Sequence, residues 1–217
     1  MKTWINTYEK KKQINNVFFP EQFLIRMFFN EKIKTIIQNN EKPSLLDVGC
    51  GYGRNIPLFK KFTQDITCID PVQSAIDYVS EKHSVKAHTF VPPNIDTNNL
   101  FDVVVCCNSI YYLNDTFDFP DYFQNITALL KSNAIFIVSF IGENHSILLN
   151  AEKVNEHYYL NNNAPKFSNR KGQKIFVPDD NFQFEDFELT ILSNGEVQDV
   201  FDGDIRHLRI FCFQKLS

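Results

Sequence analysis

Short apolar runs alternate with helical stretches through the middle of the sequence. The runs that are typical of strands cover residues 44–48, 65–69, 85–90, 101–107 and 135–141. The stretches in which apolar residues recur at helical spacing cover residues 55–62, 72–81 and 122–130. This alternation predicts βαβ units, which place parallel strands in one sheet with helices on both of its faces.

The two ends of the chain follow other patterns. Apolar residues recur at helical spacing between residues 20 and 39, which predicts one helix with Pro20 in its first turn. Beyond Gly142, a helix is predicted for residues 145–160 and a polar loop for 161–173. The remaining strand-like runs lie at 175–177, 187–192 and 206–213, and turn signals lie at 193–195 and 202–204. We expect these last strands to complete the same sheet.

Charge and cysteine content narrow the possible partners and compartments. The 217 residues include 22 basic and 26 acidic side chains, so the net charge of −4 does not favour nucleic acid or another polyanion. The five cysteines form no CxxC pair, which is typical of reduced thiols in a cytoplasmic protein. No run approaches the roughly 18 apolar residues of a membrane-spanning helix, and residues 1–16 lack the apolar centre of a secretory signal. We therefore expect a cytoplasmic protein without a membrane partner.

The most informative segment is the turn after the first predicted strand. Residues 45–55 read LLDVGCGYGRN, so an acid at the strand end is followed by glycines at alternate positions and then by a helix. Glycines let the backbone turn tightly and approach a ligand, and a helix N-terminus offers unpaired N–H groups. A dinucleotide-binding turn needs GxGxxG, but here Arg54 occupies the sixth position and Asp47 precedes the first glycine. The pattern DxGxGxG instead suits a ligand with cationic groups, such as S-adenosylmethionine (SAM).

A second acid supports this interpretation. Asp70 ends the second predicted strand, seventeen residues after Gly53, where a nucleotide-binding βαβ unit places a ribose-binding carboxylate. With LLDVGCGYGRN, TCIDP, FDVVVCCNSIYYL and LLKSNAIFIVSF, residues 44–141 resemble the class I SAM-dependent methyltransferases of bacterial small-molecule type. The resemblance implies an α/β fold: a Rossmann-like, doubly wound, mostly parallel seven-stranded sheet with helices on both faces and an N-terminal helical lid.

The resemblance also divides the chain and assigns its site. A single domain is expected, with a lid segment at 1–40, a SAM-binding core at 44–141, an acceptor-side insertion at 142–180 and closing strands at 181–217. The residues expected to contact the cofactor are Asp47, Gly49, Cys50, Gly51, Gly53, Asn55, Asp70, Pro71 and Asn108. Residues 90–94 contain no acid to contact adenine, although this family usually has one there.

The candidate catalytic residues follow the fourth and fifth strands. Tyr111 and Tyr112 lie on the loop where the family places acceptor-facing residues, and His145 follows the fifth strand. An unperturbed histidine has a pKa near neutrality, so His145 is a candidate general base. The acids at 199, 202 and 204 are typical of turns, and no metal is predicted.

Methyl transfer from a sulfonium is a direct displacement that requires alignment and a dry site, and it needs no protein nucleophile. The loop that begins at Asn108 reads NSIY, not the Asn/Asp-Pro-Pro-aromatic motif of many DNA and RNA methyltransferases. We therefore expect O- or N-methylation of a small molecule, in a surface-polysaccharide or other biosynthetic pathway, by a monomer or homodimer that releases S-adenosylhomocysteine (SAH). A protein or RNA methyltransferase and a SAM-binding protein without catalytic activity are the alternatives.

Overall fold

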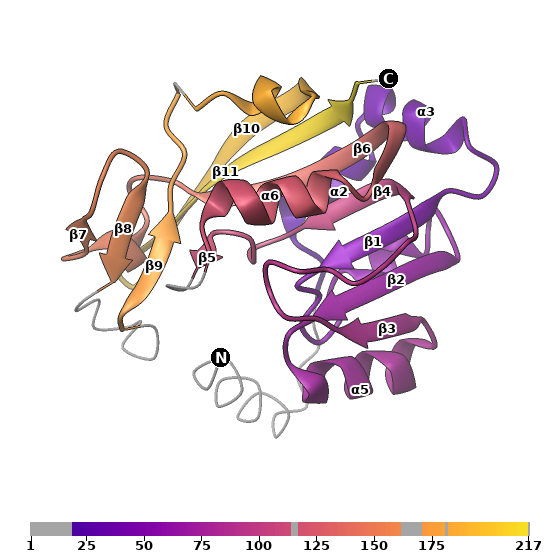
Figure 1. The fold of residues 1–217 in the computed structure, drawn as a ribbon, viewed down its shortest axis with the longest axis horizontal. Helices are drawn as coiled ribbons and strands as arrows, with labels where there is room; N and C mark the ends of the chain where they lie inside the picture. The colour runs from indigo at the N-terminus through magenta and orange to yellow at the C-terminus, as the bar shows by residue number, and fades with distance from the viewer. Residues whose placement is uncertain (1–18, 114–116, 162–170, 181, 217) are drawn as a thin grey trace.

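The centre of the protein is a seven-stranded sheet in which only one strand runs against the others (Figure 1). The computed structural model describes residues 19–113, 117–161, 171–180 and 182–216. The strand order is β10-β11-β6-β4-β1-β2-β3. The strands are β1 (Ser44–Val48), β2 (Asp65–Asp70), β3 (Lys86–Thr89), β4 (Phe101–Cys106), β6 (Leu130–Ile141), β10 (Leu189–Phe201) and β11 (Asp204–Lys215). β11 is antiparallel to both of its neighbours, so the predicted mostly parallel seven-stranded sheet is confirmed.

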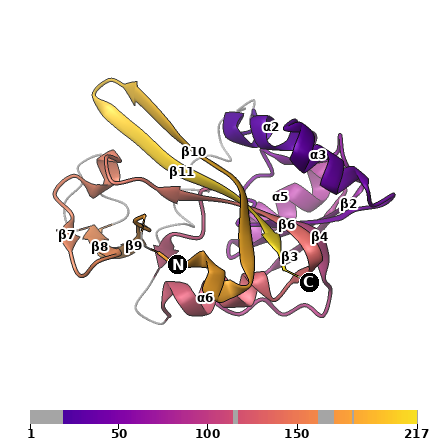
Figure 2. The same ribbon diagram turned by 90° about the horizontal axis from the view of Figure 1, so that it is seen from above.

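Helices cover both faces of this sheet, as the strand–helix alternation predicts. They are α2 (Gln22–Phe28), α3 (Glu31–Gln38), α4 (Ile56–Phe59), α5 (Gln73–His83) and α6 (Phe119–Thr127). Figure 2 shows α2 and α3 on one side of the sheet and α6 on the other. Successive residues of β1 point to opposite faces of the sheet. Leu45 packs in the core cluster that includes α2 to α5, and Leu46 packs in the cluster that includes α6. None of the described helices is long and apolar enough to cross a membrane.

A second, smaller sheet lies beside the carboxyl end of β6. Its order is β5-β9-β8-β7, and its strands are β5 (Tyr112–Leu113), β7 (Glu152–Lys153), β8 (Tyr158–Asn161) and β9 (Gln173–Phe176). Phenylalanines join it to α6, most closely where the rings of Phe119 and Phe176 stack with centroids 3.7 Å apart. This sheet was not predicted. The helix expected over 145–160 is wrong: a short 3₁₀ helix, η1 (Ser146–Leu148), is followed by β7 and β8.

The N-terminal helix expected between residues 20 and 39 is also interrupted. α2 ends at Phe28, and Asn30 begins α3 by accepting hydrogen bonds from the backbone N–H groups of Lys32 and Ile33 through its side chain. An Asn at this position caps a new helix because its side chain satisfies N–H groups that have no helical partner. Residues 1–18 of the expected lid lie outside the described residues, and the division of the chain into lid, core, insertion and closing strands stays a prediction.

The last two strands form a hairpin that is longer than the sequence indicates. The turn signal at 193–195 does not end a strand, because these residues lie within β10, next to a register irregularity between Ile191 and Ser193. The chain turns instead between Phe201 and Asp204. β11 pairs with β6 only from Leu208 onward, so the tip of the hairpin extends beyond the sheet, as Figure 2 shows.

Candidate active site

The strand order reverses between β1 and β4, and the candidate site lies where these two strands end. β1 leads outward to β2 and β3, whereas β4 lies on its other side and leads toward β6. In open α/β sheets a crevice forms at the carboxyl ends of the strands at such a reversal, and ligands bind there. The glycine-rich turn follows β1 and the loop from residue 108 follows β4, so the fold brings both predicted segments to this crevice.

The turn after β1 has the backbone form that its glycines predict. Gly49 and Gly51 have φ angles of 74° and 53°, in the left-handed region that side chains with a Cβ rarely adopt. The N–H groups of Gly49 and Cys50 both donate to the carbonyl of Ile69, at 2.8 and 3.1 Å, which ties the turn to β2. A Cβ on Gly49 would lie 2.4 Å from the Cβ of Ser109, so the loop after β4 packs directly on this glycine.

Asp70 stands at the end of β2 and holds the turn from the other side. One carboxylate oxygen accepts the N–H of Gly51 at 2.9 Å, and the other accepts the N–H of Val72 at 2.9 Å. Burial raises the pKa of Asp70 to about 6, against the lowering effect of these two bonds. A carboxylate has about four lone-pair sites, so each oxygen keeps capacity for a ligand hydroxyl.

Asp47 lies under the turn with an unmet acceptor. It is 1% exposed, and in the described part of the protein its Oδ2 has no hydrogen-bond partner. Burial, with the nearby charge of Asp70, raises the pKa of Asp47 to about 7. A buried polar atom without a partner costs free energy, so natural structures keep few of them without a functional reason. An ammonium or N–H group of a bound ligand would satisfy this acceptor, so the residues fit SAM.

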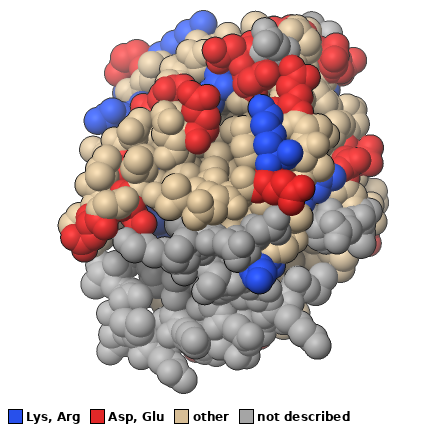
Figure 3. All heavy atoms as spheres, turned by 90° about the vertical axis from the view of Figure 1, so that its left-hand side faces the viewer, with Lys and Arg blue, Asp and Glu red and all other residues tan. Residues whose placement is uncertain are grey.

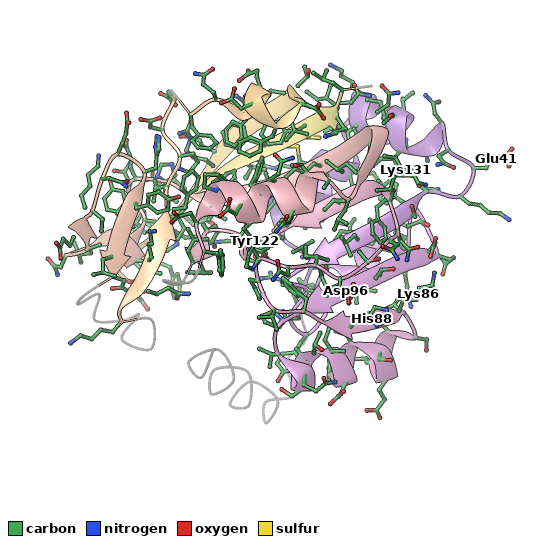
Figure 4. All side chains as sticks on the ribbon, in the orientation of Figure 1. Glu41, Lys86, His88, Asp96, Tyr122 and Lys131 are labelled. Atoms are coloured by element: carbon green, nitrogen blue, oxygen red, sulfur yellow. The ribbon has the colours of Figure 1, made fainter. Side chains whose placement is uncertain are left out.

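The pocket itself is lined by residues at or just after the ends of β1, β2, β3 and β4 and by one residue each from β5 and α6. They are Gly49, Asp70, Pro71, Phe90, Pro92, Asn108, Ser109, Tyr112 and Tyr122. Five of these were predicted from the sequence, and the structure brings them together. Phe90 and Pro92, after β3, add an apolar wall where the sequence offers no acid for adenine. Tyr122 is labelled in Figure 4, below α6, and no sequence signal singled it out from the other apolar positions of that helix.

Five of the predicted cofactor residues do not line the pocket: Asp47, described above, and four residues of the turn itself. Cys50 is buried, and Gly51 contributes the N–H that Asp70 accepts. Gly53 allows close packing of the following helix, because a Cβ there would lie 2.6 Å from Cδ1 of Ile56. Asn55 is buried and accepts the backbone N–H of Glu21 at 3.0 Å.

The loop after β4 is fastened to the turn and to β6. Ser109 Oγ donates to the carbonyl of Val48 at 2.9 Å. Asn108 has a φ angle of 57°, which Asn tolerates better than most residues, and its N–H donates to Ser139 Oγ at 2.9 Å. Both residues line the pocket, so β1, β4 and β6 together fix this wall.

The predicted catalytic residues are separated by the structure. Tyr112 lines the pocket, whereas Tyr111 is buried beside it with ring centroids 4.4 Å apart. His145 does not line the pocket and begins η1, where its Nδ1 accepts the N–H of Ile147 at 3.0 Å.

One group of three metal-capable side chains occurs among the described residues. Glu156, His157 and Asp179 have ligand atoms within 4.8 Å of one another, beside a polar cavity of about 260 Å³ between the hairpin and the second sheet. The group shares no residue with the pocket at the strand ends. The absence of a metal stays a prediction.

A family model described as a methyltransferase domain matches residues 22–184, which is well over half of the chain. The chain belongs to this methyltransferase family. Its sheet order, glycine turn and strand-end acids are those of the class I SAM-dependent methyltransferases, as the sequence resemblance implies.

Known relatives of this methyltransferase domain match it over part of their length. It is 30% identical over 118 residues to the ubiquinone biosynthesis O-methyltransferase of Rickettsia canadensis, covering 52% of the chain and 48% of the relative. The chain thus spans about half the length of the curated relatives it matches.

Solved structures match the fold of this methyltransferase domain over most or all of its length. The 1,6-didemethyltoxoflavin-N1-methyltransferase of Burkholderia thailandensis, solved with SAH, has a TM-score of 0.64 at 14% identity and covers 100% of this chain and 87% of its own. The (4+2)-cyclase SpnF has a TM-score of 0.59 at 14% identity, covering 85% and 79%. At these identities the likeness concerns the fold alone.

Proposed function

We propose that this chain is a SAM-dependent methyltransferase that methylates an oxygen or nitrogen of a small molecule. The observation that carries the proposal is the pocket at the strand reversal. It joins the left-handed glycine turn to Asp70, and the unpartnered, buried Asp47 lies beneath that turn. Two carboxylates at the carboxyl ends of neighbouring strands suit a ligand with hydroxyl and cationic groups better than they suit a pyrophosphate.

Each part of the pocket has a proposed task toward the cofactor. Asp70 accepts hydrogen bonds from ribose hydroxyls, and Asp47 compensates the positive charge of the amino-acid end. Phe90, Pro92 and Tyr122 offer flat apolar surface for adenine. SAM, when bound, supplies an activated methyl group on a cationic sulfur. The protein then has to align the acceptor and exclude water.

The second sheet is the proposed acceptor side. Tyr112 of β5 lies opposite Ile175 of β9, which lies opposite Tyr159 of β8 and then Lys153 of β7. Residues directly opposite in neighbouring strands share a face, so one row of side chains runs from the cofactor pocket across this sheet. Ile175 is fully buried, so an acceptor would contact the partly exposed Tyr112 and Tyr159 and the exposed Lys153, with its reactive atom near Tyr112. Tyr112 is therefore our first candidate for orienting the acceptor, and His145 remains a proposed base.

Two further observations support a small-molecule acceptor. The relative in Rickettsia is named for O-methylation in ubiquinone biosynthesis, and the Burkholderia structure is named for N-methylation of a toxoflavin precursor. In addition, Figure 3 shows acidic and basic side chains mixed on the face formed by the second sheet and the hairpin. The described part of that face thus lacks the continuous basic stripe that binds a phosphate backbone. A surface-polysaccharide pathway, a cytoplasmic location and a monomeric or homodimeric state remain part of the proposal.

The experiment begins with SAH titrated into the protein by calorimetry, which we expect to give one site per chain. SAM carrying a labelled methyl group is then incubated with the protein and either a small-metabolite extract or a macromolecular fraction of cells. Label in a product of low mass supports the proposal. Label only in protein or RNA would replace it with the macromolecular alternative.

A SAM-binding protein without methyl transfer is the second candidate. The likeness to SpnF supports this candidate, because SpnF shares the fold and is named as a cyclase, not as a methyltransferase. It predicts tight SAH binding and unchanged acceptors. Tight SAH binding with no transfer of label from SAM to any metabolite, protein or RNA would establish it.

A further inference from the structure

A buried carboxylate at the start of α2 connects three separate parts of the protein. Glu21 is 4% exposed, and its backbone N–H donates to Asn55 at the base of the glycine turn. Its Oε1 accepts from Arg54 Nη1 at 2.6 Å and from Asn108 Nδ2 at 3.1 Å, and its Oε2 accepts from Arg206 Nη2 at 2.7 Å. No cofactor motif contains this residue.

The partners of Glu21 come from distant positions in the chain. Arg54 belongs to the glycine turn, Asn108 follows β4 and lines the cofactor pocket, and Arg206 lies on β11. Arg206 precedes Leu208, the first residue of β11 that pairs with β6, so it belongs to the part of the hairpin that extends past the sheet. Glu21 therefore ties the hairpin and the glycine turn to one pocket residue.

Asn108 is the member of this network whose orientation matters for the pocket. Its Oδ1 accepts from Ser139 Oγ at 3.2 Å while its Nδ2 donates to Glu21, so the two ends of the amide have different partners. With its backbone in the left-handed region as well, Asn108 has little freedom once Glu21 is in place. Without the Glu21 carboxylate, the Nδ2 group would lose an acceptor and two guanidinium groups would lose their common counter-charge.

We propose that Glu21 is a positioning residue of the methyl-transfer site that acts through Asn108. It holds the Asn108 amide in the orientation that the cofactor meets, and its bond to Arg206 makes that orientation depend on the hairpin. This inference rests on the proposed function for its consequence in cofactor binding. The contact between Glu21 and Asn108 stands independently of it.

The first test is a double-mutant cycle on SAH affinity. Glu21→Gln, Asn108→Ala and the double variant are each titrated with SAH, and we expect Glu21→Gln to weaken binding by about tenfold. If Glu21 acts through Asn108, the double variant binds SAH like Asn108→Ala alone. An unchanged affinity of Glu21→Gln, or losses that multiply in the double variant, would overturn the proposal.

A matched ion pair at the opposite end of the sheet serves as control. Lys131 Nζ lies 2.7 Å from Asp102 Oδ2, and Figure 4 places Lys131 well away from Tyr122. Lys131→Met removes an ion pair of similar length, so we expect lower thermal stability with parental SAH affinity. A loss of SAH affinity equal to that of Glu21→Gln would mean that any lost ion pair loosens the pocket, and the proposal would fall.

A measurement without ligand separates this inference from the proposed function. The side-chain amide of Asn108 is observed by NMR in the parent and in Glu21→Gln, and we expect its two proton resonances to move. Resonances that stay in place would overturn the inference even if SAH binds. A parent that does not bind SAH, with resonances that do move, would overturn only the proposed function. Should Glu21→Gln fail to fold, Glu21→Asp, which keeps the charge but shortens the reach, is measured with the same expectations.

Discussion

Replacing Asp47 by Asn removes a buried charge that the ligand-free protein has to bear above neutral pH. The pKa of Asp47 rises from 3.8 to about 7 on burial, a change of roughly three units at 1.36 kcal/mol each, or about 4 kcal/mol. Because Asp47 has a higher pKa in the folded than in the unfolded protein, its protonated carboxyl favours the folded state. This stabilisation is complete below pH 3.8 and is lost as the pH rises through 7. The asparagine has no such dependence.

The difference in unfolding free energy between variant and parent is therefore expected to change with pH. From pH 5 to pH 8 it should shift by about 3 kcal/mol in favour of Asp47→Asn, since about two of the three units lie in this window. The cost of leaving the new amide N–H₂ group unpaired is independent of pH and cancels in this comparison. Urea unfolding of both proteins at pH 5, 6, 7 and 8 measures the shift.

Binding should change in the opposite direction. The affinity of the parent for SAH is expected to rise toward pH 8 as Asp47 loses its proton, whereas the variant keeps only the dependence that comes from Asp70, with its pKa of about 6, and is roughly 10-fold to 100-fold weaker at pH 8. Asp102→Asn is the control, because the pKa of Asp102 is lowered by Lys131 and Ser44 in spite of its partial burial. Its stabilising effect is lost only in acid. Parallel stability curves for Asp47→Asn and parent from pH 5 to 8 would refute the reasoning.

Four further substitutions examine the rest of the site. Asp70→Ala should weaken SAH binding by about 1.5 to 3 kcal/mol or more, because it removes a ribose acceptor and the anchor of the Gly51 N–H; unchanged calorimetric affinity in a folded variant would contradict the assignment. Gly51→Val should abolish SAH binding with the core largely intact, since the φ of 53° is unfavourable for a β-branched residue; parental binding would mean that the turn does not contact the ligand. Tyr112→Phe and His145→Ala should each lower methyl transfer by about 100-fold with little change in SAH affinity, and full activity in both would place the catalytic groups elsewhere.

The cofactor half of the protein is predictable because its signals are local. A strand ending in Asp47, a turn that needs left-handed glycines and an acid at the end of the next strand all follow from short segments. The mostly parallel seven-stranded sheet then follows from the resemblance to one family. The strands β1, β2 and β4 begin where the sequence predicts, and their ends differ from the prediction by at most one residue.

The acceptor half is harder to predict because its strands are short and pair over long distances. β7 has two residues and β5 has two, so neither contains enough residues for a period-two pattern to show. The interval from 145 to 160 has enough apolar residues to suggest a helix, but its fold is set by pairing with β9 and by packing against α6. Phe90, Pro92 and Tyr122 have no sequence signal of a site, since only the fold brings them to one pocket.

The contacts of Glu21 also could not be predicted from the sequence. The sequence places it in the first turn of the helix predicted between residues 20 and 39, and none of its partners can be deduced from that position. Arg206 is 185 positions away, on a strand whose predicted start coincides with it. A contact at that separation leaves no trace in local pattern, so only the three-dimensional arrangement shows it.

The placement of the second sheet has a consequence for how such a protein changes over evolutionary time. Three of its four strands occupy a single connection, between β6 and β10, while the residues that line the pocket at the strand ends lie before residue 123. Exchange of residues 142–176 with the equivalent connection of another family member would leave the glycine turn, Asp47 and Asp70 untouched. Under the proposed function, new acceptors would be acquired by recombination within one stretch of gene, and a chimera built at these two junctions is expected to show altered substrate choice.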